Sequence, residues 1–228
     1  MKIITVAGPP SCGKTSVIIK VIERLREKGI SAGVVKFDCL VTNDHLKYKE
    51  NNIPVLIGLS AGQCPDHYFI TNIVEADRWA QNQNFDMLIV ESAGLCNRCS
   101  PHLRELSSVC VMDYLAGMQA PQKTGPMLKL ADLVIITKGD MVSQAEREVF
   151  SQQISILNPS ARIISVNGLN GYGVNSVCRF FFNANECNSV EDLHLRFPMP
   201  SALCSYCLGG TMVGRRRQIG NTKRLKVM

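Results

Sequence analysis

The chain has 228 residues, of which 46% are hydrophobic and 19% charged, and its formal net charge is +6. That length suits one α/β domain with a short appendage, and no segment approaches the roughly 18 consecutive apolar residues that a membrane span requires. The N-terminus leads straight into a strand rather than a signal peptide, and ten scattered cysteines are typical of reduced thiols and metal ligands rather than a disulfide framework. We therefore expect a cytoplasmic protein without membrane association. Because no aromatic residues interleave with the basic ones, we expect no nucleic-acid partner.

The strongest motif lies within the first sixteen residues. Apolar residues 3–6 predict a buried strand, and the helix expected from Lys14 has apolar residues at helical spacing as far as Leu25. Between them, G-x-x-x-x-G-K-T matches a phosphate-binding loop, whose backbone N–H groups surround the phosphates at the start of a helix. A chance Gly-rich turn would not explain this strand and this helix. The residues expected to bind the phosphates are Gly8, Pro9, Pro10, Ser11, Cys12, Gly13, Lys14, Thr15 and Ser16.

Strands and helices alternate along the chain as far as residue 183. The expected strands cover residues 3–6, 32–37, 55–59, 87–90, 109–112, 133–137 and 162–166, and the expected helices cover 14–28, 67–82, 122–131, 143–156 and 173–182. The polar stretch 43–52 is assigned to neither. This alternation predicts a P-loop NTPase fold of the α/β class, a mostly parallel, doubly wound sheet with helices on both faces. We expect one domain over 1–183 and an appendage over 184–228.

Ligands of such sheets bind at the carboxyl ends of the strands, where two acidic residues are expected. Asp38 ends the strand at 32–37, and Glu91 follows the strand at 87–90. We expect Asp38, Glu91 and the Thr15 hydroxyl to hold Mg²⁺. With Lys14 on the β- and γ-phosphates, Asp38 and Glu91 would form the catalytic set for nucleotide hydrolysis.

A second motif indicates guanine. Thr137-Lys-Gly-Asp140 fits the [NT]-K-x-D pattern, in which Lys138 stacks on the base and the carboxylate of Asp140 accepts from the ring N–H and the exocyclic amine. Adenine offers no matching pair of donors, so we expect GTP as the nucleotide. An ordinary surface turn is the alternative. The residues expected to touch the same base after the next strand are Asn167, Gly168 and Leu169.

The segment Glu91-Ser-Ala-Gly94 resembles the E-x-x-G segment of the metal-insertion GTPases (CobW/HypB/UreG type), a group that includes the urease and hydrogenase nickel-insertion proteins. The resemblance covers about residues 1–182. It implies a GTPase in which Glu91 works with Mg²⁺ and water, Gly94 senses the γ-phosphate, and Asp38 is the first switch aspartate. It further implies a homodimer whose nucleotide state controls delivery of a metal or metallocofactor to a client metalloenzyme or maturation factor.

A second segment of this resemblance concerns metal binding. Residues 62–67, G-Q-C-P-D-H, resemble the G-G-C-P-H segment of the urease protein, which binds metal between two subunits. The resemblance implies Cys64 and His67 as ligands. The chain departs from the pattern because Asp66 stands between Pro65 and His67.

Two C-x-x-C pairs supply further candidate ligands. Cys96 and Cys99 follow directly after Gly94, and His102 lies three residues beyond Cys99. The other pair, Cys204 and Cys207, lies in the appendage. Four thiolates suffice for tetrahedral Zn²⁺ or an iron–sulfur cluster, and the family resemblance adds Ni²⁺.

Several alternatives remain open at this stage. Buried cysteines also pack as small apolar residues, which is the interpretation for Cys39, Cys110 and Cys178, and a redox dithiol is a third possibility. The two pairs could meet in one chain or across a dimer. The basic residues at 215–217 and 223–226 form either a solvated terminus or a surface for an acidic partner.

Two other functions also fit the phosphate loop. One is an ATP-dependent iron–sulfur carrier, in which the nucleotide only locks a dimer, and the other is a small-molecule kinase. A kinase would need an acceptor pocket and leaves the guanine motif unexplained. No water-positioning Gln or arginine finger is evident, so we expect slow intrinsic turnover.

Overall fold

The computed structural model describes residues 1–40, 42–197, 210–214, 216–217 and 223–225. The strands among these residues form one seven-stranded sheet in the order β3-β2-β4-β1-β5-β6-β7. The strands are β1 (Lys2–Ala7), β2 (Ala32–Asp38), β3 (Val55–Leu59), β4 (Met87–Ser92), β5 (Ser107–Asp113), β6 (Leu133–Thr137) and β7 (Arg162–Ser165). All neighbouring strands pair in parallel. The predicted parallel α/β fold is confirmed.

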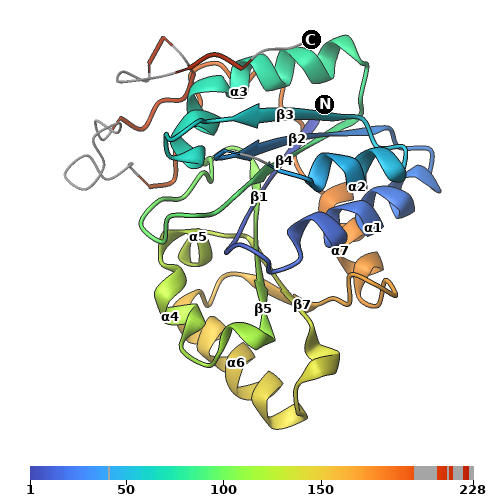
Figure 1. Cartoon of the computed structure of the whole chain (residues 1–228), viewed down its shortest axis with the longest axis vertical. Helices are drawn as coiled ribbons and strands as arrows, with labels where there is room; N and C mark the ends of the chain where they lie inside the picture. The colour runs from blue at the N-terminus through green and yellow to red at the C-terminus, as the bar shows by residue number, and fades with distance from the viewer. Residues whose placement is uncertain (41, 198–209, 215, 218–222, 226–228) are drawn as a thin grey trace.

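Helices cover both faces of the sheet (Figure 1). The helices are α1 (Lys14–Arg26), α2 (Asp44–Glu50), α3 (Pro65–Asn82), α4 (Ala120–Thr124), α5 (Pro126–Lys129), α6 (Gln144–Leu157) and α7 (Val174–Phe182). Side chains of α1, α2 and α7 share one hydrophobic cluster on one face, while α3 packs on the other face and α5 and α6 pack beside it. Within the part of the chain described, no helix is both long and apolar enough to cross a bilayer.

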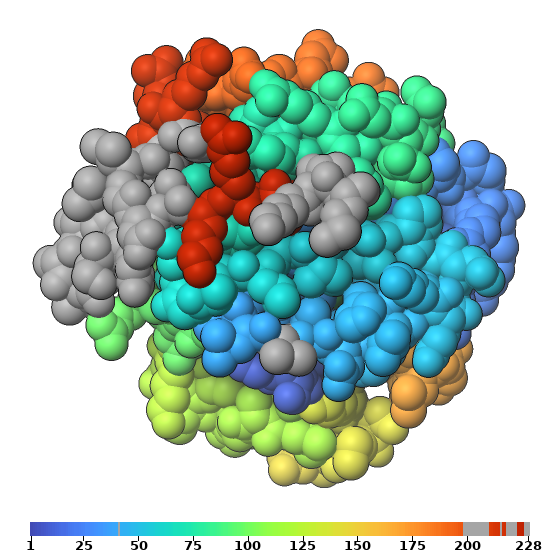
Figure 2. All heavy atoms as spheres, turned by 45° about the horizontal axis from the view of Figure 1, so that its top comes forward, coloured from blue at the N-terminus to red at the C-terminus, as the bar shows by residue number. Residues whose placement is uncertain are grey.

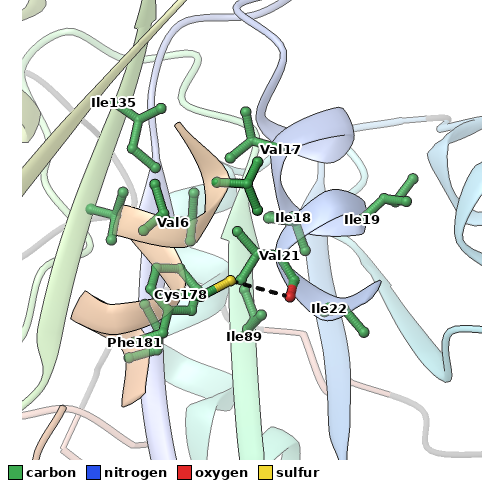
Figure 3. Packing of buried hydrophobic residues seen from close by; sticks show 14 of the residues in the cluster. Val6, Val17, Ile18, Ile19, Val21, Ile22, Ile89, Ile135, Cys178 and Phe181 are labelled. Atoms are coloured by element: carbon green, nitrogen blue, oxygen red, sulfur yellow. Dashed lines mark hydrogen bonds between the residues drawn. The ribbon is translucent and has the colours of Figure 1, made fainter. Parts of the chain in front are cut away.

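Helices on both faces of the sheet explain why the central strands are largely apolar. Along β1, Ile4 and Val6 face α1 while Ile3 faces α3, so both faces of the strand are buried. Val21 of α1 meets Cys178 of α7 over the sheet (Figure 3), and the Cys178 thiol donates to the Val21 carbonyl at 3.6 Å. Full burial contributes about 1.5–3 kcal/mol for each large aliphatic side chain, which fixes α1 behind the phosphate loop.

The structure differs from the expected elements in two places. The polar stretch 43–52 contains the short helix α2, whose Tyr48 is fully buried. Seven residues give little local helical signal, so this tertiary contact decides its formation. The single helix expected at 122–131 is two helices, because Gly125 lies between them at φ +63°, where an added Cβ would lie 2.2 Å from the Asn97 carbonyl oxygen.

The expected packing of three cysteines is confirmed for two of them. Cys110 and Cys178 are buried in the core, whereas Cys39 is only half-buried after the end of β2. Cys39 therefore does not act as a core residue.

The described residues beyond 183 pack on the α3 side of the sheet. Val190, Leu195 and Val213 are buried in the same cluster as α3, and the red C-terminal residues lie across its surface in Figure 2. Arg196 fastens this segment through two contacts of 2.7 Å with the Asp132 carboxylate. The expected ligands Cys204 and Cys207 lie outside the described residues, as do Arg215 and Lys226.

Candidate functional site

The loop between β1 and α1 has the backbone geometry of a phosphate-binding loop. Gly8 has φ +150°, and a Cβ there would lie 2.1 Å from the carbonyl oxygen of Val111. Gly13 is the N-cap of α1 in the left-handed conformation at φ +89°, which aims the first amides of α1 into the loop. Both glycines are therefore required by the shape of the loop.

A cavity of about 520 Å³ opens over this loop. Lys14 curves across the loop, and its Nζ donates to the carbonyl oxygens of Gly8 at 2.9 Å and Pro9 at 2.8 Å. Cys12 turns away into the core, where burial raises the pKa of its thiol. The cavity is lined by Pro10, Ser11, Gly13, Lys14, Thr15, Ser16, Lys36, Asp38, Asp44, Lys47, Glu91, Ala93, Leu95 and Lys138.

Glu91 is the centre of a buried polar cluster beside the loop. The Thr15 hydroxyl donates to Glu91 Oε1 at 3.0 Å, and the Tyr48 hydroxyl donates to Oε2 at 2.6 Å. Lys36 Nζ lies 2.9 Å from Oε1. Burial, followed by the charge of Glu91, raises the pKa of Tyr48 well above its usual value, so the phenol stays a donor. Each Glu91 oxygen therefore has a defined partner.

Lys36 lines the same cavity and is a candidate site residue that sequence reasoning missed. Its side chain is 4% exposed, and its Nζ lies 2.5 Å from Asp44 and 3.8 Å from Asp38. Burial alone would lower the pKa of Lys36, but the carboxylates of Glu91 and Asp44 outweigh it and raise this pKa. A single lysine in the otherwise apolar run of β2 was the available signal. Its partner Asp44 was missed because α2 was missed.

The oxygen ligands that this cluster offers fit Mg²⁺, the cofactor implied by the phosphate loop. Mg²⁺ prefers hydroxyl and carboxylate oxygens and shares its coordination with substrate phosphates. Three carboxylates surround one buried lysine, so the cluster carries excess negative charge that a bound cation would offset. The oxygens come from Thr15, Asp38, Asp44 and Glu91.

The guanine motif meets the phosphate loop through two of its side chains. The Thr137 hydroxyl donates to the Cys12 carbonyl at 2.7 Å, so Thr137 positions the loop. Lys138, in the left-handed conformation at φ +59°, donates to the Ser11 carbonyl at 2.9 Å and pairs with Asp113 at 3.2 Å. Asp113, at the end of β5, was not expected from the sequence.

A second cavity, of about 460 Å³, is lined by two of the other base-binding candidates. Asp140 is exposed and lines it together with Asn167. The Asn167 side chain accepts from the backbone N–H of Leu169 at 2.9 Å and so shapes the turn. Gly168 lies against Ser16 of α1, whereas the Leu169 side chain is 84% exposed. The structure thus brings Asp140 and Asn167 to one cavity beside the phosphate loop.

The segment after β4 passes directly over the phosphate loop. Gly94 has φ +63°, and a Cβ there would lie 1.9 Å from the Gly8 carbonyl oxygen. Only glycine allows this approach. Glu91 and Gly94 therefore both contact the nucleotide-binding loop, from opposite ends of a four-residue segment.

Cysteines from two segments approach one another at the start of α3, where Cys64 and Cys99 meet and Cys96 lies beside Cys99. Cys64, the N-cap of α3, has its sulfur within 4.8 Å of the Cys99 sulfur and of a carboxylate oxygen of Asp66. The Cys99 thiol lies 3.4 Å from the Cys96 sulfur. The hydrogen bond from Cys99 lowers the pKa of Cys64 and raises the pKa of Cys99, so the Cys64 thiolate forms first. These sulfurs can hold a soft or borderline metal.

The two expected histidine ligands lie elsewhere. His67 is buried on α3, but the group of potential metal ligands among the described residues contains Asp66 instead. His102 is buried beside β1, with Nδ1 3.2 Å from the Thr5 hydroxyl and Nε2 3.0 Å from the Met127 carbonyl oxygen. Burial lowers the pKa of His102 to about 4. The structure does not bring His102 to the cysteines.

Asp66 is a further residue that sequence reasoning did not select. It is completely buried, and its Oδ1 accepts a hydrogen bond from the Ser92 hydroxyl. Burial raises the pKa of its carboxyl to about 6 against the opposing effects of Ser92 and Lys14. Its position directly after Pro65 was the available signal.

Comparisons with known proteins agree with this geometry. The CobW/HypB/UreG nucleotide-binding domain matches residues 2–165. An uncharacterised protein of Methanocaldococcus jannaschii is 43% identical over 225 residues, covering 99% of this chain and 96% of that protein. The urease accessory protein UreG of Trichodesmium erythraeum is 30% identical over 188 residues, covering 77% of this chain and 88% of that UreG.

Solved structures extend the comparison to the fold. The hydrogenase maturation factor HypB from Archaeoglobus fulgidus superposes with a TM-score of 0.63 at 19% identity, covering 80% of this chain and 89% of that one. HypB from Helicobacter pylori, solved in complex with nickel, gives 0.63 at 18% identity, covering 80% and 86%. The match over residues 2–165 shows that the chain belongs to the CobW/HypB/UreG family of metal-insertion GTPases.

Proposed function

We propose that this protein binds and hydrolyses GTP and couples its nucleotide state to the delivery of a bound metal to a client metalloenzyme or maturation factor. The observation that carries the proposal is the path of one short segment. Glu91 contacts Thr15 at the phosphate loop, Gly94 lies against Gly8, and Cys96 follows two residues later beside Cys99. A movement of this segment at the γ-phosphate therefore moves two potential metal ligands.

In the nucleotide site, the chain's own residues bind and orient GTP. Lys14 exchanges its two carbonyl contacts for the β- and γ-phosphates, and the amides at the start of α1 bind phosphate oxygens. Thr15, Asp38 and Glu91 would hold Mg²⁺, which would supply positive charge against the charge that develops on the phosphates. Asp140 recognises guanine. No glutamine or arginine lines the cavity among the described residues, which supports slow turnover.

In the metal site, Cys64, Cys96 and Cys99 bind the transferred ion. Two sulfurs bound at about 2.3 Å to tetrahedral Zn²⁺ lie about 3.8 Å apart, which compares with 3.4 Å between the Cys96 and Cys99 sulfurs and is within the 4.8 Å limit for Cys64 and Cys99. Zn²⁺ and Ni²⁺ are the proposed ions, and a reducing cytoplasm would keep the thiols as ligands. Cys204 and Cys207 would complete or extend the site, from the same chain or across a homodimer.

Metal titration in two nucleotide states tests this proposal. We expect the affinity for Zn²⁺ or Ni²⁺ to differ between protein bound to a GTP analogue and protein bound to GDP, and Cys96→Ser and Cys99→Ser to weaken binding in both states. By linkage, the metal must change GTP affinity by the same factor. Equal metal affinity in the two states would reject the coupling. Loss of binding only in Cys204→Ser and Cys207→Ser would move the site to the appendage.

Substitution of the phosphate-loop lysine tests the nucleotide part separately. Lys14→Ala removes the charge nearest the β- and γ-phosphates and should abolish GTP hydrolysis while the protein stays folded. Hydrolysis at the wild-type rate would overturn the assignment of the site. Iron together with acid-labile sulfide in anaerobically purified protein would favour the iron–sulfur carrier instead, because neither Zn²⁺ nor Ni²⁺ brings sulfide.

A further inference from the structure

The Asp66 carboxylate has an unusual environment for a charged group. It is 0% exposed in the first turn of α3, and Ser92 is its hydrogen-bond donor at Oδ1. Its Oδ2 is buried and has no hydrogen-bond partner in the part of the chain that the structure describes. Leaving a buried carboxylate oxygen without a partner costs several kcal/mol. Such an oxygen requires a cation or a proton at that position.

A structural role in capping α3 does not explain this oxygen. A carboxylate in the first turn of a helix is stabilised by the helix dipole and commonly accepts a backbone N–H. Oδ2 of Asp66 accepts none. No lysine, arginine or histidine forms an ion pair with Asp66 within the described ranges. Its neighbours are the sulfurs of Cys64 and Cys99. One carboxylate oxygen of Asp66 lies within 4.8 Å of both sulfurs.

We propose that Asp66 is the oxygen ligand of a mixed thiolate–carboxylate site for a tetrahedral divalent cation such as Zn²⁺, and that Ser92 couples this site to the nucleotide. The other ligands are Cys64, Cys96 and Cys99. This inference rests on the proposed function for the three thiolates. It adds the residue that stands where the resemblance has a histidine, and it names the contact through which the two sites communicate.

The coupling follows from the alternation of side chains at the end of β4. Successive strand residues point to opposite faces, so Glu91 faces α1 and the phosphate loop while Ser92 faces α3. One strand end therefore holds both sites. A metal that draws Asp66 towards the cysteines changes the position of Ser92 and, through the backbone, of Glu91 at its 3.0 Å contact with Thr15. By linkage, the factor by which Zn²⁺ changes the affinity for GTP must equal the factor by which GTP changes the affinity for Zn²⁺.

Metal binding to the full chain, measured by competition with a chromophoric chelator, tests the ligand assignment. Asp66→Asn keeps the shape of the side chain and removes its charge, and we expect it to weaken Zn²⁺ binding at least about tenfold. Asp77→Asn is the matched control, because Asp77 is a buried carboxylate on the same helix that also has an oxygen without a hydrogen-bond partner, but it lies outside the group formed with Cys64 and Cys99. It should bind Zn²⁺ as the wild type does. Unchanged affinity in Asp66→Asn would overturn the assignment.

X-ray absorption at the zinc edge of the wild-type protein provides a measurement that needs no variant. Three sulfur neighbours and one oxygen neighbour are expected, and four sulfur neighbours would overturn the proposal. The outcomes also separate this inference from the function on which it rests. If Cys96→Ser and Cys99→Ser lose Zn²⁺ while Asp66→Asn keeps it, only the ligand assignment fails. If the cysteine variants also keep it, the proposed metal function fails.

The Ser92→Ala variant tests the coupling. We expect it to keep Zn²⁺ affinity within about threefold, because it removes no ligand, but to abolish the effect of Zn²⁺ on the affinity for a GTP analogue. Isothermal titration with and without Zn²⁺ measures this ratio. A wild-type ratio in Ser92→Ala would refute the role of the Ser92–Asp66 contact.

Discussion

Removal of the Lys36 charge should destabilise this protein far more than removal of an exposed lysine. Lys36→Met keeps the length of the apolar stem but leaves Glu91, which is 0% exposed, without its ion pair at 2.9 Å, and Asp44 without its contact at 2.5 Å. Breaking a buried pair from one side costs about 3–5 kcal/mol, a large part of the roughly 5–15 kcal/mol that stabilises a typical domain.

Urea unfolding followed by circular dichroism measures this cost. With a slope of about 2 kcal/mol per molar urea, the midpoint should fall by about 2 M in the presence of a chelator. Added Mg²⁺ should restore part of the loss, because a divalent cation can take the place of the ammonium among the carboxylates. Lys36→Met combined with Glu91→Gln should be more stable than Lys36→Met alone, since the uncompensated charge is then removed.

The matched control lies in the same cluster. Lys47 pairs with Asp44 at 3.5 Å, but its side chain is 59% exposed. Lys47→Met should therefore change stability by no more than about 1 kcal/mol. If Lys36→Met and Lys47→Met shift the midpoint equally in chelator, the assignment of Lys36 as the buried counter-charge of Glu91 is wrong.

Three further predictions concern pH, the loop and the base. Because the pKa of buried His102 is about 4, the unfolded chain binds more protons as the pH falls below 6.5. The stability that neutral His102 contributes is present above pH 6.5, and about 3 kcal/mol of it is lost towards pH 4. In urea unfolding, the stability of His102→Gln should therefore fall less between pH 6.5 and pH 4 than that of the wild type. The same pH profile for both proteins would contradict this. Gly94→Ala places a Cβ 1.9 Å from the Gly8 carbonyl oxygen and should weaken GTP binding at least about tenfold by calorimetry, whereas a folded variant with wild-type affinity would refute the close approach. Asp140→Asn should shift the preference from GTP towards xanthine nucleotides, and wild-type protein that bound ATP as tightly as GTP would favour the kinase alternative.

The sequence by itself determined the class of the fold and the phosphate loop. The strand–loop–helix around Lys14 is written in consecutive residues, because a loop that surrounds phosphate needs glycines and a helix start at fixed spacing. The alternation of apolar strands with helices likewise predicts a parallel sheet from local patterns. For the same reason the expected helix at 143–156 was found close to its place, Gln144–Leu157, with Ser143 capping it.

Only the tertiary structure decided which distant side chains meet. Lys36 meets Glu91 because β2 pairs with β4 in a register that sets these two residues side by side. Asp66, rather than His67, lies with Cys64 and Cys99, because α3 begins at Pro65 and turns the next residue inwards. Such contacts depend on strand order and helix phase, which join segments tens of residues apart. No local pattern encodes these contacts, so the roles of the buried Lys36 ammonium and of Asp66 as a candidate metal ligand could be inferred only from the folded chain.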